Sequence, residues 1–183
     1  MLFNLPNLLT LSRILAVPLI MGAFYMDRPF GMYIAFVLFV VAGITDFFDG
    51  YLARSTGAVS KLGQFLDPIA DKLMVGAILM MLVWDQTVDG VHVIAAIIIL
   101  SREILVSGLR EFLAGTEVSV PVSQLAKWKT AVQMIAIGAL VLAGANPPYL
   151  PAIEVGLIGL WLAALLTLIT GYDYLRHGLK HMT

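Results

Sequence analysis

The sequence contains no cysteine, only three histidines and few charged residues. The absence of cysteine excludes disulfide bonds and thiolate metal sites. Charged residues make up 13% of the 183 residues, whereas a soluble domain carries about 25%. The formal net charge of −1 argues against nucleic acid as a partner, because such partners select strongly basic surfaces. These absences point away from a soluble domain, a disulfide-stabilised protein and a nucleic-acid-binding protein.

Apolar residues make up 60% of the chain, and they come in long blocks. A membrane-spanning helix needs roughly 20 mostly apolar residues, and in lipid every backbone polar group must be satisfied internally. The blocks are too long and too uniform for barrel strands. The sequence therefore predicts an all-α integral membrane protein, with residues 1–183 forming a single membrane domain. The six predicted transmembrane helices cover residues 8–26, 31–54, 66–84, 91–113, 125–144 and 153–175.

The N-terminal residues 1–5 are expected to lie along the membrane interface. They include Leu2, Phe3 and Leu5, and Pro6 follows as a residue suited to a first helical position. The first apolar segment has neither a basic opening nor a small-residue cleavage site, so we expect it to remain as a span and not to be a cleaved signal.

The positions of lysine and arginine predict the orientation in the membrane. With six spans, the connections alternate sides and both termini share one side. Of the eleven basic residues, Arg28 alone falls on the side opposite the termini. Cytoplasmic loops carry an excess of lysine and arginine, so both termini are expected to be cytoplasmic. The ten residues on the side of the termini are Arg13, Arg54, Lys61, Lys72, Arg102, Arg110, Lys127, Lys129, Arg176 and Lys180.

Four aspartates stand at the inner ends of the second and third spans. Asp46 and Asp49 are three residues apart and share a helix face, and Asp67 and Asp71 are four apart and share another. A short inner loop brings the two helix ends together. We therefore expect four carboxylates to converge from two facing helices.

Four like charges near lipid require either protonation or a neutralising cation. All the expected ligands are hard oxygen atoms, which favours Mg²⁺ or Mn²⁺ over Zn²⁺. Four carboxylates are enough for two ions, and a paired site is a common clamp for phosphoryl transfer. The alternative is that the aspartates cap helices or pair with Arg54, Lys61 and Lys72. Charged residues at membrane depth usually have a function, which favours the metal site.

Small residues are interleaved with the aspartates. Gly50, Ala53 and Gly63 would let a flat or bulky group approach the backbone, with Arg54 beside it.

At these residues the sequence resembles the CDP-alcohol phosphatidyltransferase family. The family pattern is two aspartates three apart, a glycine, an Ala-Arg pair, eight residues, a second glycine, and two aspartates four apart. The resemblance implies a six-helix membrane fold, a CDP-linked donor and a homodimer. The residues that match the pattern are Asp46, Asp49, Gly50, Ala53, Arg54, Gly63, Asp67 and Asp71.

The resemblance also implies a mechanism, in which the donor diphosphate binds the metal ions, the alcohol hydroxyl attacks the β-phosphorus and CMP leaves. Asp46, Asp49 and Asp67 are similar to the main metal ligands of the family, and Asp71 is similar to its general base. Because a metal-bound carboxylate is a weaker base, Asp71 either touches the metal with one oxygen or mainly orients the hydroxyl. The residues that the resemblance assigns to CDP binding are Asp46, Asp49, Gly50, Ala53, Arg54 and Gly63.

The acceptor alcohol must be inferred from other residues of the inner face. Arg102 and Arg110 are about 80° apart around a helix and could line one cavity. Lys127 and Lys129 are about 200° apart, so one is expected to point inward and the other to reach the headgroups. We expect an inward cluster of Arg110, Lys127 and Arg102, which suits an acceptor that carries a phosphate.

Here, and in residues 4–13, the chain resembles bacterial family members that transfer the phosphatidyl group of CDP-diacylglycerol to sn-glycerol 3-phosphate. That resemblance implies phospholipid synthesis at the bacterial inner membrane, in contact with membrane lipids, with the active site facing the cytoplasm. The alternatives are a related transferase that uses inositol phosphate, serine or phosphatidylglycerol, and a cation transporter. Each basic residue could also contact anionic lipid, and Arg102 and Arg110 could pair with Glu103, Glu111 or Glu117. The transporter is disfavoured because the aspartates gather at one surface and do not step across the bilayer.

Overall fold

The computed structural model describes residues 5–56, 61–115 and 124–179, which form six helices joined by turns and loops. No strand occurs in these three stretches. The predicted all-α fold is therefore confirmed for the described part of the chain. The helices are α1 (Leu5–Ala23), α2 (Phe30–Thr56), α3 (Lys61–Trp84), α4 (His92–Gly115), α5 (Gln124–Ala143) and α6 (Ala152–Leu179).

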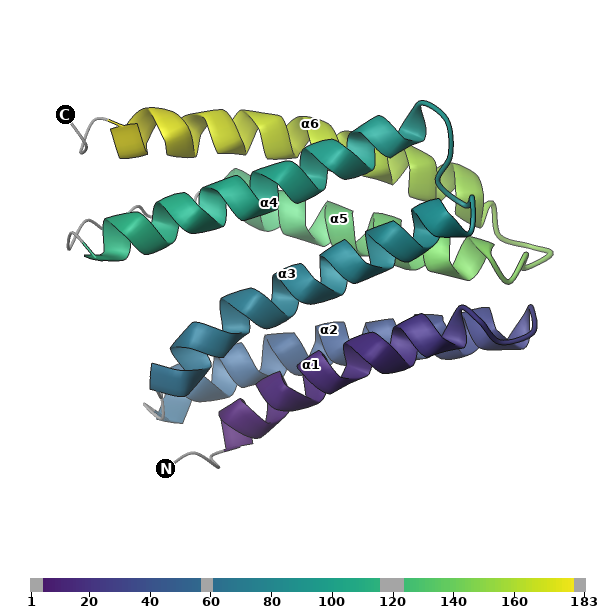
Figure 1. The fold of residues 1–183 in the computed structure, drawn as a ribbon, viewed down its shortest axis with the longest axis horizontal. Coiled ribbons are helices and arrows are strands. Elements are labelled where there is room, and N and C mark those ends of the chain that lie inside the picture. Colours follow the sequence, from purple (N-terminus) through teal and green to yellow (C-terminus); the bar gives the residue numbers. More distant parts are fainter. Residues whose placement is uncertain (1–4, 57–60, 116–123, 180–183) are drawn as a thin grey trace.

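Successive helices run in opposite directions along the long axis of the molecule (Figure 1). The beginning of α1 and the end of α6 lie at the same end. Asp46 lies in the second half of α2, and Asp67 and Asp71 lie in the first half of α3, so we call this end the aspartate end. The connections that follow α1, α3 and α5 lie at the other end, which we call the opposite end.

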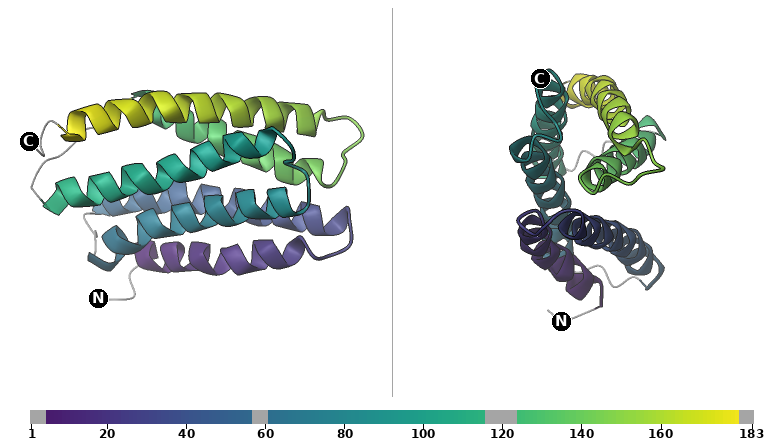
Figure 2. Two further views of the ribbon diagram at one scale, coloured as in Figure 1. Left: turned by 45° about the horizontal axis from the view of Figure 1, so that its top comes forward. Right: turned by 90° about the vertical axis from the view of Figure 1, so that its right-hand side faces the viewer.

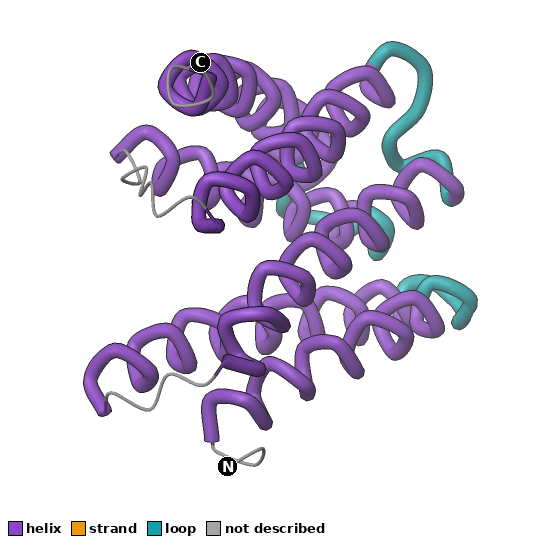
Figure 3. The backbone as a smooth tube through the Cα atoms, turned by 60° about the vertical axis from the view of Figure 1, so that its left-hand side comes forward, coloured by secondary structure: helices purple, strands orange, loops and turns teal. Residues whose placement is uncertain are grey.

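The helices form two groups of three. α1 packs against α2 and α3, while α6 packs against α4 and α5. The groups meet where α3 contacts α4 and α5 and where α2 contacts α5. Viewed along the helices, α3 and α4 lie side by side and link the two groups (Figure 2), and the tube view shows the same division (Figure 3).

Each predicted span corresponds to one helix, and the differences lie at the ends. The first helix stops at Ala23 and not at residue 26, because the amides of Phe24 and Met26 bond to carbonyls three residues earlier and form a turn. The third helix begins at Lys61, five residues before its predicted start at 66, so it includes Gly63. Pro6 lies in the first turn of α1, and residues 1–4 of the predicted interfacial segment lie outside the described residues.

Three helices are long and apolar enough to cross a membrane among the described residues: His92–Leu113, Gln124–Ala143 and Ala152–Arg176. Two shorter apolar stretches, Asn7–Ala23 and Phe30–Asp46, belong to α1 and α2. Large apolar side chains are exposed on the outer faces of the helices, including Leu15, Val37, Ile97, Ile135 and Ile158. Such a surface is stable in contact with lipid and not with water. The chain is therefore a membrane protein.

Helices α5 and α6 approach closely at two glycines of α6. A Cβ atom placed on Gly156 would lie 2.6 Å from Cγ of Leu140, and one on Gly159 would lie 2.9 Å from Cβ of Ala136. Small residues allow helix backbones to pack closely in membranes, where packing replaces the hydrophobic effect as the driving force.

We expect Gly156→Val to lower the free energy of unfolding by about 1–3 kcal/mol, the usual cost of overpacking. The added methyl groups must displace Leu140 or separate α5 from α6. The measurement is the thermal unfolding midpoint of the detergent-solubilised protein. Gly22→Val in α1 is the matched control, since a Cβ there meets nothing within 4 Å. Equal midpoints for the two variants would contradict this account of the α5–α6 contact.

Candidate functional site at the aspartate end

Arg13 of α1 connects the aspartates of two other helices. Its Nη1 donates hydrogen bonds to Oδ1 of Asp46 on α2 and, at 2.5 Å, to Oδ1 of Asp71 on α3. The Arg13 side chain is 0% exposed, whereas the side chains of Asp46 and Asp71 are 45% and 50% exposed. One buried guanidinium nitrogen therefore bridges two carboxylates whose other sides remain accessible.

Thr10 extends the contact by one helical turn. Its hydroxyl donates a hydrogen bond of 2.5 Å to Oδ1 of Asp67 on α3. Asn7, one turn earlier, is also buried. Asn7, Thr10 and Arg13 follow one another at intervals of three residues and share one side of a mostly apolar helix. This polar face of α1 gathers three of the four predicted aspartates.

The sequence interpretation did not assign Thr10 or Arg13 to the site. The signal was nevertheless present, since a mostly apolar helix with three polar residues at helical spacing is expected to turn that polar face toward the protein and not toward lipid. The side chains of the other predicted residues Asp49, Gly50, Ala53 and Arg54 lie outside those that the structure describes. Gly63 is buried in the first turn of α3.

The arrangement of Asp46 and Asp71 suits a cation. Their Oδ1 atoms approach each other closely enough to bond to one nitrogen, and both are hard oxygen ligands of the type that Mg²⁺ and Mn²⁺ prefer. Within the described stretches, no group of three or more acidic, histidine or cysteine side chains is arranged to hold a metal ion. The described carboxylates thus fit a divalent cation in chemistry and supply part of a ligand set.

Sequence reasoning left open whether the aspartates pair with nearby basic residues. The partner that the structure provides for Asp46 and Asp71 is Arg13, which comes from another helix. Lys72, one of the local candidates, donates from Nζ to the carbonyl oxygen of Pro68 at 2.7 Å.

Arg102, a predicted acceptor-binding residue on α4, is directed toward α6. Its Nη2 donates to Oγ1 of Thr170 at 3.0 Å, and its guanidinium carbon lies 5.8 Å from the ring centroid of Tyr174. Its Nη1 also lies 3.7 Å from Oε1 of Glu103. Arg102 therefore ties α4 to α6 in the structure.

Of the two lysines at the start of α5, Lys129 points into the protein and Lys127 is exposed. The ammonium group of Lys129 donates to Oε1 of Glu103 on α4. Glu103 thus lies between Arg102 and Lys129 and links α4 with α5. Arg110, the third predicted acceptor-binding residue besides Arg102 and Lys127, is exposed on the last part of α4.

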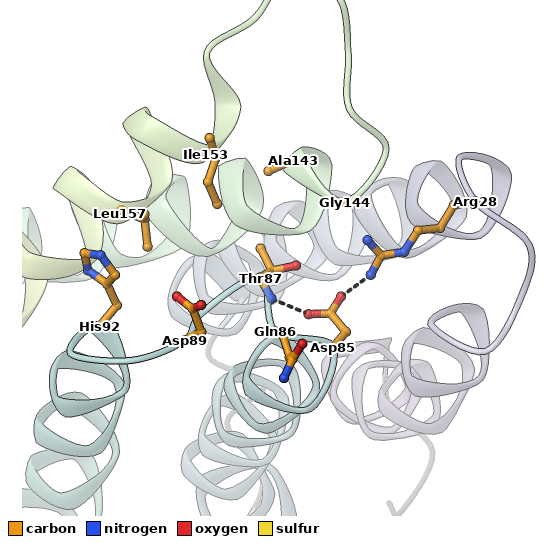
Figure 4. A pocket seen from close by; sticks show the side chains of 10 residues that line it. All are labelled: Arg28, Asp85, Gln86, Thr87, Asp89, His92, Ala143, Gly144, Ile153 and Leu157. Atoms are coloured by element: carbon orange, nitrogen blue, oxygen red, sulfur yellow. Dashed lines mark hydrogen bonds and ion pairs between the residues drawn. The ribbon is translucent and has the colours of Figure 1, made fainter.

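A polar pocket of about 360 Å³ lies at the opposite end of the molecule (Figure 4). Within it, Arg28 donates to Asp85 at 2.6 Å, and the amide of Thr87 donates to the other oxygen of Asp85 at 2.9 Å. Asp89 and His92 complete its polar rim. Asp71 of α3 lies 14 residues before Asp85, which follows α3 directly and lines this pocket, and this is about 21 Å at the rise of a helix. The pocket is therefore not the predicted site.

An apolar groove of about 690 Å³ runs between α2 and α5. It begins at Phe48, two residues after Asp46, and continues past Gly43 and Phe36 toward Leu150 and Val155 near the opposite end. On α2 the lining extends from Phe48 to Phe36, a distance of about 18 Å at the 1.5 Å rise of a helix. The groove therefore leads from the aspartate end along the apolar part of the bundle.

Comparisons with known proteins identify one family. The family model described as CDP-alcohol phosphatidyltransferase matches residues 3–169. A protein of Rickettsia bellii is 54% identical over 94% of each chain, and one of Rickettsia felis is 50% identical over the same shares. A Bacillus subtilis protein is 39% identical, again over 94% of each chain. All three are named CDP-diacylglycerol–glycerol-3-phosphate 3-phosphatidyltransferase.

We expect Glu103→Gln to lower the free energy of unfolding by about 3 kcal/mol, because it leaves the buried Lys129 without its negative partner. Adding Lys129→Met should restore part of this loss, since an apolar pair can replace a buried ion pair at little cost. Thermal unfolding midpoints of the single and double variants test this. Glu154→Gln, at an exposed position of α6, is the control. A Glu103 variant that is as stable as the Glu154 variant would refute the role of the Glu103–Lys129 contact.

Proposed function

The chain belongs to the CDP-alcohol phosphatidyltransferase family, and we propose that it transfers the phosphatidyl group of CDP-diacylglycerol to sn-glycerol 3-phosphate. The products would be phosphatidylglycerol phosphate and CMP. The similar proteins named above support this reaction, because their names specify the same donor and acceptor. The structural observation that carries the proposal is the gathering of Asp46, Asp67 and Asp71 on the polar face of α1.

The family is generally dependent on a divalent metal. We propose that the four aspartates, Asp46, Asp49, Asp67 and Asp71, hold two ions of Mg²⁺ or Mn²⁺. When bound, such ions neutralise the charge of a diphosphate and polarise its phosphorus–oxygen bonds. The protein contributes the positions of the carboxylates, which are set by the packing of α1 against α2 and of α1 against α3.

Asp71 is the residue that we propose to act on the acceptor. Its carboxylate accepts a hydrogen bond from the acceptor hydroxyl, orients the oxygen toward the β-phosphorus and takes up the proton. The new oxygen–phosphorus bond forms as the bond to the CMP oxygen breaks. Gly50, Ala53, Arg54 and Gly63 are proposed to hold the CDP part of the donor, so that the reacting atoms lie in line.

The apolar groove between α2 and α5 suits the lipid part of the donor. It starts beside the aspartate end and is lined by apolar residues, so an acyl chain can lie in it while the headgroup stays at the aspartates. About 0.8 kcal/mol is gained for each methylene group that is removed from water, which favours keeping the chains in lipid or in the groove throughout the reaction.

For the acceptor phosphate we propose Arg110, Lys127 and Arg102. Arg110 and Lys127 are exposed and can reach an anion that enters from the cytoplasm. Arg102 contacts Thr170 and Glu103. It would therefore act either by holding α4 against α6 beside the acceptor or by rotating its side chain toward the phosphate.

The same proposal includes the placement in the cell. Residues 1–183 would form one domain with six membrane-spanning helices, both termini and the active site would face the cytoplasm, and two copies would form a homodimer in the bacterial inner membrane. The ten-to-one distribution of basic residues supports this orientation.

Replacing Asp67 or Asp71 by Asn should lower the rate of CMP release at least about a hundredfold, because a metal ligand or a base is lost. CMP release from CDP-diacylglycerol by the purified protein in detergent micelles measures this. Asp89→Asn, at an exposed position of the opposite end, should retain the wild-type rate. Substantial activity of the Asp67 and Asp71 variants would remove these residues from the active site.

CMP release should depend on glycerol 3-phosphate, and Arg110→Gln should raise its KM about tenfold or more, since a charge-assisted hydrogen bond contributes about 1.5–3 kcal/mol. The KM for CDP-diacylglycerol should stay unchanged. Initial rates with glycerol 3-phosphate, inositol phosphate, serine and phosphatidylglycerol test the acceptor, with Arg28→Gln as the matched control. A preference for another acceptor would show that the assignment of glycerol 3-phosphate is wrong. An equal rate of CMP release without any acceptor would show the same.

A further inference from the structure

Arg13 is an unusual residue for its helix. It is the sole charged residue of α1, and its side chain is completely buried. Burial of an unpaired charge costs several kcal/mol, so the position is stable because Asp46 and Asp71 supply negative partners. The guanidinium reaches them from inside the bundle, while the exposed sides of both carboxylates are open to ions from water.

The contact uses the atoms that a metal ion would need. A single nitrogen of Arg13 bonds to one oxygen of Asp46 and one oxygen of Asp71. Mg²⁺ binds carboxylate oxygens at about 2.0–2.1 Å, so a divalent ion between the same two oxygens would lie almost against that nitrogen. Two positive groups at such a distance repel strongly in a partly buried site. The guanidinium and the ion are therefore alternative occupants.

We propose that Arg13 is a built-in counter-ion, which neutralises Asp46 and Asp71 in the metal-free protein and is displaced from them when a divalent cation binds. This inference rests on the metal site of the proposed function. Thr10 holds Asp67 separately, so the exchange concerns the pair that Arg13 bridges. In this scheme the metal-free enzyme keeps the aspartate end folded, and metal affinity is lowered by the free energy needed to break the two ion pairs.

The test compares Mn²⁺ binding by wild type and Arg13→Gln in nanodiscs without CDP-lipid, with free Mn²⁺ measured by electron paramagnetic resonance. Arg13→Gln should bind Mn²⁺ at least about tenfold more tightly, because no competing cation remains. In EDTA the same variant should have a lower unfolding midpoint than wild type, and saturating Mg²⁺ should close most of the difference. If Arg13 only supported the fold, its replacement would weaken Mn²⁺ binding.

Arg28→Gln is the matched control, since it removes an arginine that is paired with an aspartate at the opposite end. It should leave Mn²⁺ affinity unchanged. If Arg13→Gln does not fold, Arg13→Lys serves instead, and its Mn²⁺ affinity should exceed that of wild type, because an ammonium lacks the planar fork that matches carboxylates. Unchanged or weaker Mn²⁺ binding by the variant that folds would overturn the inference.

The inference and the proposed function fail in different ways. Wild-type protein that binds Mn²⁺ and releases CMP, combined with an Arg13 variant that binds no more tightly, would overturn the exchange alone. Wild-type protein that releases no CMP with any acceptor would overturn the proposed function, and the comparison of Mn²⁺ affinities would still decide the role of Arg13.

Discussion

The aspartate end depends on one buried ionic contact, in which Arg13 neutralises carboxylates from two other helices. Without a cation, Asp46 and Asp71 would repel each other and drive apart the segments of α2 and α3 that carry them. Because the guanidinium comes from α1, the contact also fixes the position of the first helix relative to the other two. The same contact thus holds three helices together and sets the spacing of the groups on which the proposed chemistry relies.

Much of the fold could be predicted from the sequence, because the apolar blocks that lipid requires are long and are separated by turn residues. Every predicted span has a corresponding helix. The ends were less accurate, since they depend on local hydrogen bonding, as in the turn after Ala23. The early start of α3 was missed because Lys61 and Gln64 are polar, although a polar segment can extend a helix beyond the lipid.

The site was predictable where its residues are close in sequence. The four-residue spacing of Asp67 and Asp71 indicated a shared helix face, and in the structure both contact α1. Arg13 was not predictable in this way, since it lies 33 and 58 residues from its partners. The contact of Lys129 with Glu103 spans 26 residues and depends on the packing of α4 beside α5 and α6. Periodicity alone cannot reveal such partners.

The division of the bundle into two groups of three has a consequence for biogenesis. The described groups that meet at the aspartate centre are Thr10, Arg13, Asp46, Asp67 and Asp71. All belong to the first three helices, which are consecutive in the chain. A nascent chain that has inserted α1, α2 and α3 into the bilayer already contains these groups, and the charges of α2 and α3 can be neutralised there by Arg13. Because insertion proceeds from the N-terminus, Arg13 enters the membrane before Asp46 and Asp71. The two carboxylates can therefore be neutralised before the second half of the protein is inserted.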